Sequence, residues 1–124
     1  NGESWKIGVQ NPLDLASDLK TLDAKGKNIA VATSGITKRK GMNGSVEWNH
    51  IIDPRTGLSV KNNLLAVTVI SDKVYKSDVF AKTALILGEK EGIDFINKQE
   101  SAECVAIDKD LNFYFSKNAK EYFV

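Results

Sequence analysis

One long helical segment stands among segments with the character of β-strands, and this contrast constrains the fold more than any other feature. In residues 75–87, apolar side chains recur at helical spacing, and Gly88 follows as a C-terminal cap. A second, shorter helical piece is predicted at residues 91–98. Strand-like runs interrupted by one helical block predict an α+β fold, in which a mainly antiparallel sheet packs against one main helix and a short second helix. A doubly wound parallel sheet is not expected.

Several segments predict strands, because apolar and β-branched residues alternate or cluster in them. They are residues 5–9, 19–24, 29–32, 46–52, 64–70, 103–108 and 113–116. The stretch 13–22 is ambiguous, since its leucines also fit a helical stripe. The turn-forming residues 25–28 favour a hairpin that joins 19–24 to 29–32. A basic loop should follow Gly35, a tight turn should span 53–57, and a turn centred on Asp110 should join the last two strands.

Length, charge and cysteine usage exclude several classes of protein. The 124 residues suffice for one globular domain, 1–124, and are too few for two. With 17 basic against 16 acidic residues, the chain lacks the positive field of nucleic-acid-binding proteins, so no nucleic-acid partner is expected despite the basic run 38–40. No apolar run approaches the ~20 residues of a membrane-spanning helix. Cys104, the only cysteine, lies in an apolar run and is expected to be a buried hydrophobic residue.

Three segments carry more polar chemistry than their structural roles require. They are Thr33-Ser34-Gly35, residues 50–57 (HIIDPRTG) and residues 77–88 (SDVFAKTALILG). Their order and spacing, with residues 5–12 in front, resemble the C-terminal part of the ApbE-type FAD:protein FMN transferases, also called the thiamine biosynthesis lipoprotein family. The HIIDPRTG segment is the most specific part of this resemblance. The resemblance implies an ApbE-like α+β fold and phosphoryl-group transfer, in which a protein mainly positions groups and neutralises developing charge.

The resemblance also implies a reaction, a metal and partners. Enzymes of this family bind FAD, split its diphosphate with a divalent metal, usually Mg²⁺, and transfer FMN to a threonine of a flavoprotein subunit, so that AMP leaves. The acceptor would be a subunit of a membrane redox complex. An extracytoplasmic, membrane-associated location through an N-terminal lipid anchor, missing from this chain, is also implied. A single cysteine is compatible with either side of the membrane, so a cytoplasmic location stays open.

His50 and Asp78 are the candidate catalytic residues. The resemblance places His50 at the diphosphate, where a neutral imidazole could accept the threonine proton and a charged one could hold a phosphate oxygen. The alternative is a strand histidine whose ring nitrogens are satisfied locally. Asp78 is expected at the beginning of the main helix, where unpaired backbone amides favour a carboxylate. The resemblance makes Asp78 a metal ligand.

The candidate cofactor-binding residues are Thr33, Ser34, His50, Arg55 and Lys82. Thr33 and Ser34 end a predicted strand, so their hydroxyls could meet a ligand there. Arg55 lies in the rigid turn and could present its planar guanidinium to a phosphate, or it could simply be solvated. Asp53 is expected to form the turn, because its position before the bend already explains it.

Lys82 departs from the family pattern. The resemblance implies a threonine four residues after Asp78, where its oxygen would be a second metal ligand, but this sequence has Lys82 there. Thr83 cannot replace it, because at 100° per residue it lies about 140° around the helix from Asp78. An ammonium beside Asp78 would repel a divalent cation. Two hypotheses follow: Lys82 stands in for the cation and contacts the flavin diphosphate, or the chemistry of the family is weakened or lost.

The N-terminal part of the family pattern, which lines most of the flavin site, has no counterpart in these residues. Ile36 and Thr37 also replace the Asp-Tyr pair that commonly follows Thr-Ser-Gly in the family. The chain is therefore expected to be the C-terminal portion of a flavin transferase, inactive on its own: a fragment, a cleavage product, or one part of a site completed by another chain. A homo-oligomer, formed through an apolar patch that an incomplete domain exposes, is a further option. The alternatives are a non-catalytic flavin-binding or assembly module of the same fold and, ranked last, a structural domain fused to a redox protein.

Overall fold

The computed structural model describes residues 3–37 and 40–123. Its elements, in chain order, are β1 (Lys6–Asn11), β2 (Asp14–Asp23), β3 (Ala30–Gly35), β4 (Lys40–Asn43), β5 (Val46–Asn49), β6 (Ile52–Asp53), β7 (Leu58–Ser59), β8 (Leu64–Ser71), α1 (Val74–Leu87), α2 (Glu89–Asn97), β9 (Glu103–Asp108), β10 (Phe113–Phe115) and the 3-10 helix η1 (Ala119–Tyr122). The strand pairs are antiparallel, so the predicted α+β class is confirmed. The first two residues of the basic run 38–40 lie outside the described residues.

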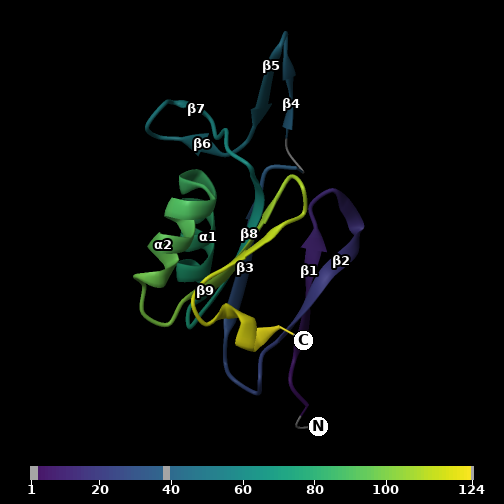
Figure 1. Ribbon diagram of the computed structural model, residues 1–124, viewed down its shortest axis with the longest axis vertical. Coiled ribbons are helices and arrows are strands. Elements are labelled where there is room, and N and C mark those ends of the chain that lie inside the picture. Colours follow the sequence, from purple (N-terminus) through teal and green to yellow (C-terminus); the bar gives the residue numbers. More distant parts are fainter. Residues whose placement is uncertain (1–2, 38–39, 124) are drawn as a thin grey trace.

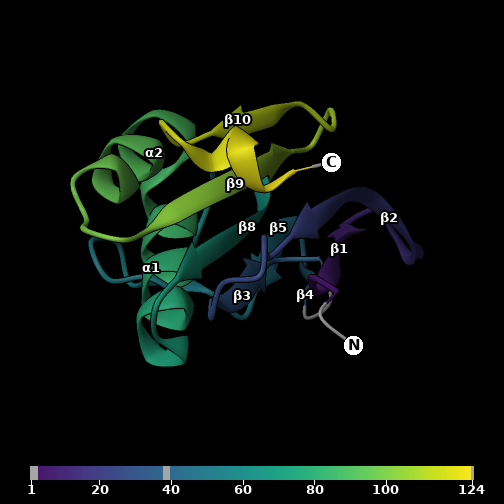
Figure 2. The same cartoon turned by 90° about the horizontal axis from the view of Figure 1, so that it is seen from below.

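A four-stranded sheet with the order β10-β9-β8-β3 lies between two layers. Helices α1 and α2 cover one face of this sheet, and the hairpin of β1 and β2 lies on the other side (Figure 2). The hairpin of β4 and β5 extends away from these layers at the top of Figure 1. The β3 strand forms one edge of the sheet.

The central strand β8 is buried along almost its whole length because both of its faces are covered. Val67 and Val69 face the helices and pack in one cluster with Ala81 and Leu85 of α1. On the opposite face, the residues Val105 and Ile107 of β9 pack with Val9 of β1. This double burial explains why β8 and β9 are apolar runs and not alternating sequences.

Both predicted helices are present. The α1 helix begins one residue before the predicted start, and Gly88 ends it with a φ of 93°, while the Gly88 N–H donates to the Ala84 oxygen at 3.1 Å. Gly88 also precedes α2, which begins at Glu89, two residues earlier than predicted. Where the helices meet, Phe80 and Phe95 pack edge to face with ring centroids 5.6 Å apart. Neither helix in the described ranges has the length and apolar character needed to cross a membrane.

The predicted hairpin between residues 19–24 and 29–32 is wrong. Residues 14–23 form the single long strand β2, which pairs with β1, so the helical alternative for 13–22 is also wrong. Residues 30–35 form β3, which pairs with β8 and includes Thr33 and Ser34. The turn after Ala24 does form, because the Lys27 N–H donates to the Ala24 oxygen at 3.0 Å. The turn connects two different layers of the protein. The strand before it, β2, carries the buried Leu22 and is not part of the four-stranded sheet, whereas the strand after it, β3, belongs to that sheet and packs against α1.

The predicted strand 46–52 is interrupted, and the predicted basic loop after Gly35 contains the strand β4, which pairs with β5. The interruption, at residues 50–51, follows Asn49, whose side chain replaces strand hydrogen bonds. Its Oδ1 accepts from the Ile51 N–H at 2.9 Å, and its Nδ2 donates to the Val60 oxygen at 3.1 Å. Such side-chain bonding satisfies a buried backbone without continuing the ladder.

The β9 strand matches its prediction, and β10 ends one residue earlier than predicted. The predicted turn around Asp110 is confirmed, because β9 ends at Asp108, β10 begins at Phe113 and the Leu111 N–H donates to the Asp108 oxygen at 3.0 Å. The buried Asp108 carboxylate accepts hydrogen bonds from the Asp110 N–H at 2.9 Å, the Asn112 N–H at 2.9 Å and the Tyr114 hydroxyl at 2.9 Å. Burial raises the pKa of Asp108, but these hydrogen bonds outweigh burial and leave the pKa below its ordinary value.

Candidate functional site

A cleft of about 490 Å³ lies where the end of β3, helix α1, the β1–β2 hairpin and the segment after β5 meet. Its polar lining residues are Gln10, Thr33, Ser34, Thr37, His50, Asp78 and Lys82. Its other lining residues are Gly8, Pro12, Leu15, Gly35, Ile51 and Ala66. All of the candidate site residues except Arg55 therefore line one cleft, although they come from segments far apart in the sequence.

The cleft passes over an edge of the sheet, so β3 contributes side chains from both of its faces. Thr33 lies opposite Thr68, and Ser34 lies opposite Val67. Because opposite residues share a face, Ser34 is on the helix side and Thr33 is on the side of the β1–β2 hairpin. Thr33 is exposed and Ser34 is buried. The Thr33 and Thr68 hydroxyl oxygens lie 2.8 Å apart, which fixes the Thr33 side chain beside the cleft.

Backbone groups of β3 also face this edge. The Ile36 N–H donates to the Leu65 oxygen at 3.1 Å, and in an antiparallel ladder every second residue bonds to the partner strand. Thr33 and Gly35 are therefore the residues whose N–H and C=O groups point away from β8. Within the described residues, β3 pairs with β8 alone. The cleft thus offers backbone amide donors beside the side-chain hydroxyls.

Helix α1 is held against β3 by a buried serine. The Ser77 hydroxyl donates to the Ala30 oxygen at 2.9 Å and lies 2.7 Å from the Ser71 hydroxyl. The next residue, Asp78, and Lys82 one turn later are both exposed and line the cleft. The expectation that Asp78 begins the helix is wrong, because α1 begins at Val74 and its first turn contains no acidic residue. The helix terminus therefore does not explain Asp78.

His50 reaches the cleft because the chain turns at Asn49. The Asn49 side-chain bonds hold the chain so that Asn49 and Ile51 are buried. His50, which lies between them in the sequence, is exposed. No hydrogen bond to the His50 ring occurs among residues 3–37 and 40–123 of this structure. The imidazole is thus available to a ligand in the cleft, in contrast to a histidine satisfied by its own strand.

In the turn after β6, the Arg55 side chain forms an ion pair with Asp53. The Asp53 carboxylate accepts from the Arg55 N–H at 2.9 Å, from Nε at 3.1 Å and from Nη2 at 2.9 Å, and Nη2 also lies 3.3 Å from the Ile86 oxygen. These bonds hold the pKa of Asp53 below its ordinary value and raise the pKa of Arg55. Asp53 forms the turn as expected. Arg55 ties the turn to the end of α1 and does not line the cleft.

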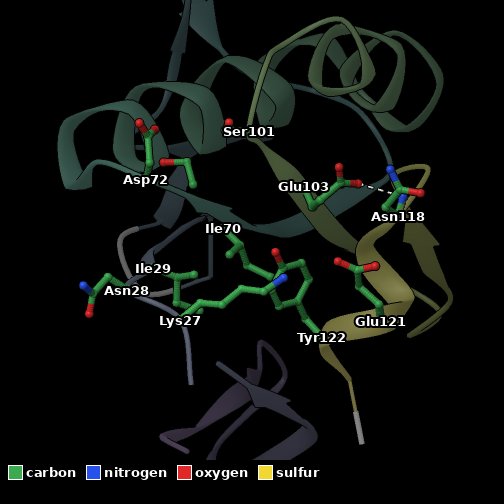
Figure 3. Close-up of a pocket in the computed structure, with 11 residues that line it drawn as sticks. Lys27, Asn28, Ile29, Ile70, Asp72, Ser101, Glu103, Asn118, Glu121 and Tyr122 are labelled. Carbon is green, nitrogen blue, oxygen red and sulfur yellow. Dashed lines mark hydrogen bonds between the residues drawn. The ribbon is translucent and has the colours of Figure 1, made fainter. Parts of the chain in front are cut away.

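A second pocket, of about 310 Å³, lies at the opposite end of β8 (Figure 3). Its lining includes the carboxylates of Asp72, Glu103 and Glu121, with Lys27 beside the Tyr122 ring. Glu103 accepts a hydrogen bond from the Asn118 N–H at 2.8 Å, drawn as the dashed line in Figure 3. Three carboxylates against one lysine disfavour an anionic ligand. The cleft at the end of β3 is therefore the better candidate for a diphosphate.

Some cleft residues were not singled out from the sequence. Gln10 and Leu15 line the cleft, but a polar or apolar residue in a strand carries no signal of its own. Thr37, which stands out only as a departure from the family pattern, lines it too. Gly8 could be noticed in the sequence, because a glycine inside an alternating strand often marks a close approach of another group. In the structure, a Cβ at this position would lie 2.0 Å from the Asp18 Oδ2. Cys104 is buried as expected, and burial raises the pKa of its thiol to about 12.

The residues present do not form a usual divalent metal site. Asp78 is the one carboxylate among the cleft-lining residues that the structure describes, and the ammonium of Lys82 belongs to the same lining. The described part of the chain contains no group of three or more His, Cys, Asp or Glu residues that could hold a metal ion. Mg²⁺ prefers oxygen ligands that include one or two carboxylates, and a neighbouring cation opposes its binding.

Comparison with known proteins places this arrangement in a family. The chain is 29% identical over 113 residues to an FAD:protein FMN transferase of Klebsiella pneumoniae, covering 90% of this chain and 35% of that protein. It is 31% identical over 114 residues to an FAD:protein FMN transferase of Buchnera aphidicola subsp. Schizaphis graminum, covering 91% of this chain and 33% of that protein. The chain thus spans about a third of the length of these curated relatives.

Solved structures share the fold. The crystal structure of the ApbE protein of Thermotoga maritima matches with a TM-score of 0.82 and 25% identity, covering 97% of this chain and 38% of that one. The flavin transferase ApbE of Vibrio cholerae matches with a TM-score of 0.72 and 28% identity, covering 95% and 37%. A model of the ApbE family matches residues 1–106. Since that match covers most of the sequence, the chain belongs to the ApbE family.

Proposed function

We propose that this chain forms the diphosphate-side wall of an FAD:protein FMN transferase. The observation that carries the proposal is the convergence of Thr33, Ser34, His50, Asp78 and Lys82 on one cleft. These residues come from three separate segments, and the cleft combines hydroxyls, an imidazole, a carboxylate and an ammonium. The relatives named FAD:protein FMN transferase support this assignment.

The proposed reaction is a phosphoryl-group transfer. The hydroxyl oxygen of an acceptor threonine attacks the phosphorus of the FMN half of FAD, and the bond from that phosphorus to the bridging oxygen breaks. AMP leaves with the electron pair, and the hydroxyl proton passes to a base. His50 fits this role because its exposed ring has no partner within the described residues. Asp78, which lines the same cleft, is the second candidate for the proton or for orienting the hydroxyl.

The remaining groups position the diphosphate. The hydroxyls of Thr33 and Ser34, with the outward N–H groups of β3, can donate hydrogen bonds to phosphate oxygens. Lys82 adds the positive charge that the transferred group requires. Arg55 is also a predicted cofactor-binding residue. Its guanidinium would have to break its bonds to the Asp53 carboxylate to reach the cleft.

The transfer activity is proposed for the longer assembly and not for this chain alone. The chain corresponds to about a third of its curated relatives, and the resemblance assigns most of the flavin contacts to the part that is not represented here. A second copy or another chain could complete the site. By the same resemblance, the acceptor is a flavoprotein subunit of a membrane redox complex on the extracytoplasmic side. Mg²⁺ is part of the reaction implied by the resemblance, although the donor set of this cleft does not fit it.

One observation favours a second function of the same fold. Lys82 beside Asp78 in a cleft with one carboxylate is compatible with a module that binds flavin, or assists assembly, without transferring FMN. Both functions require flavin binding, but only the transferase releases AMP. The two functions therefore differ in chemistry and not in ligand.

The experiment that tests the proposal measures AMP released from FAD by this chain and by the longest natural chain that contains it, with and without Mg²⁺. Transfer of flavin to a candidate acceptor is followed by the fluorescence of the labelled protein after denaturation. AMP release by the longer chain supports the transferase. Binding of FAD without AMP release supports the non-catalytic module, and the absence of both contradicts the family-based proposal.

A further inference from the structure

We propose that the Lys82 ammonium is the fixed cation of this cleft, so that the diphosphate of FAD binds here without a divalent metal ion. This inference rests on the proposed function for the identity of the ligand. It goes beyond that function in assigning the source of the positive charge. The donor set of the cleft, with one carboxylate and one ammonium among its described residues, does not fit Mg²⁺.

Lys82 lies four residues after Asp78 on α1. Residues four apart lie on the same face of a helix, and both side chains line the cleft. Thr83, the residue after Lys82, does not line the cleft, and its Oγ1 donates to the Val79 oxygen at 2.8 Å. The helix thus presents to the cleft one carboxylate and one ammonium, and no second oxygen ligand.

The Lys82 ammonium is not neutralised by Asp78. No ion pair joins them within the described ranges, although Asp and Lys at this spacing commonly pair. The same spacing does give a pair nearby, where Lys76 Nζ lies 3.1 Å from the Asp72 Oδ1. Lys82 also makes none of the hydrogen bonds in this part of the chain. Its charge is therefore free to meet an anion.

The neighbouring groups suit an anion bound at Lys82. Lysine binds phosphate as a point charge that needs no fixed planar geometry. The Thr33 hydroxyl and the outward N–H groups of Thr33 and Gly35 provide neutral donors in the same cleft. A phosphate held between the ammonium and these donors has its charge compensated without a metal ion.

The effect of the Asp78 charge on diphosphate affinity distinguishes binding through Lys82 from binding through a metal ion. If a metal ion bridged Asp78 and the diphosphate, removal of the carboxylate charge would weaken diphosphate binding. If Lys82 is the cation, the Asp78 carboxylate repels the diphosphate and its neutralisation strengthens binding. The substitution Asp78→Asn therefore changes the affinity in opposite directions in the two cases.

The test uses the folded chain labelled with ¹⁵N and inorganic pyrophosphate as the probe, in the presence of EDTA. We expect saturable amide shifts around residues 33–35 and 78–82. Lys82→Thr should weaken binding by at least about tenfold, as expected for the loss of a hydrogen bond to a charged group. Asp78→Asn should strengthen binding about threefold or more. Both side chains are exposed, so the variants should keep the dispersed spectrum of the folded chain.

Matched controls come from α2. Lys90→Thr and Asp94→Asn make the same chemical changes at exposed helix positions outside the cleft, and should leave the pyrophosphate affinity unchanged. Mn²⁺ alone, as a paramagnetic probe, should not selectively broaden the amide signals around Asp78.

Several results would overturn the inference. They are a requirement for Mg²⁺ in pyrophosphate binding, an unchanged affinity in Lys82→Thr, a weaker affinity in Asp78→Asn, and selective Mn²⁺ broadening at Asp78. Absence of pyrophosphate binding at millimolar concentration would count equally against it. Failure of the proposed function is distinguishable, because it is measured as the absence of FAD binding and AMP release by the longer chain both with and without Mg²⁺.

Discussion

The buried Ser77 hydroxyl of α1 donates a hydrogen bond to the Ala30 oxygen at the start of β3, across a distance of 2.9 Å. This bond links the helix that carries Asp78 and Lys82 to the strand that carries Thr33 and Ser34. The two walls of the cleft are thus fixed to each other by a contact inside the core. The stability of the fold and the geometry of the candidate site depend on the same hydroxyl.

Replacing Ser77 with alanine should destabilise the protein by about 1–3 kcal/mol, because the Ala30 oxygen and the Ser71 hydroxyl would lose a buried partner. Urea unfolding followed by circular dichroism measures the free energy of unfolding. Ser45→Ala, at an exposed loop position, is the control and should change stability little. Equal stabilities of the two variants would contradict the bracing role.

Gly92→Ala should destabilise the protein although alanine favours a helix more than glycine by about 1 kcal/mol. A Cβ at Gly92 would lie 2.4 Å from the Ala84 oxygen, so α2 would have to move away from α1. We expect a net loss of about 1–3 kcal/mol, typical of overpacking. Thermal unfolding measures it, with the exposed Lys90→Ala as the comparison. A raised melting temperature in Gly92→Ala would show that the helices separate without cost.

Cys104 should make the stability of the protein depend on pH in alkaline solution. Burial raises its pKa from the ordinary 9.0 to about 12, so the neutral thiol favours the folded state. The stabilising contribution is complete below pH 9.0 and is lost as the pH rises from 9.0 toward about 12. Urea unfolding of the wild type and of Cys104→Ala across this range isolates the effect from other titrating groups. A constant difference between the two proteins would contradict the raised pKa.

The same burial should protect the thiol from alkylation. Iodoacetamide at mildly alkaline pH should modify Cys104 in urea and leave it unmodified in the folded protein, since the thiolate is the reactive form. Mass spectrometry counts the adducts. Rapid alkylation of the folded chain would show that this strand opens readily.

His50 should matter for flavin transfer by the longest natural chain and little for folding. His50→Gln keeps a polar side chain at this exposed position but removes the proton acceptor, and we expect a loss of about 100-fold or more in AMP release. Circular dichroism should show an unchanged fold. A variant that retains full activity would leave Asp78 as the candidate base.

Local features of the fold could be predicted from the sequence. The helix at 75–87, the strands at 64–70 and 103–108 and the turn at 53–57 are correct because periodicity, β-branched runs and Pro–Gly turn chemistry act within a few residues. The predicted strand 46–52 is too long because one of the Asn49 side-chain bonds that end β5 is made to Val60, eleven residues away. No local pattern contains that partner.

The candidate site divides in the same way. The polar segments around Thr33, His50 and Asp78 stand out in the sequence, and all three reach the cleft. Arg55 stands out as well, but the carboxylate two residues before it takes up the guanidinium. Gln10 and Leu15 carry no sequence signal, and they enter the site because the β1–β2 hairpin lies beside β3.

By itself, the sequence determined the types and approximate limits of the main elements, the turn at Asp53 and the burial of Cys104, because these follow from local propensity and composition. Only the tertiary structure decided that β3 pairs with β8 and not with its neighbour β2. The physical reason is that strand pairing is settled by which faces can be buried together. The apolar face of β3 is covered by α1 and that of β2 is not, and the cleft forms at the edge that this choice leaves open.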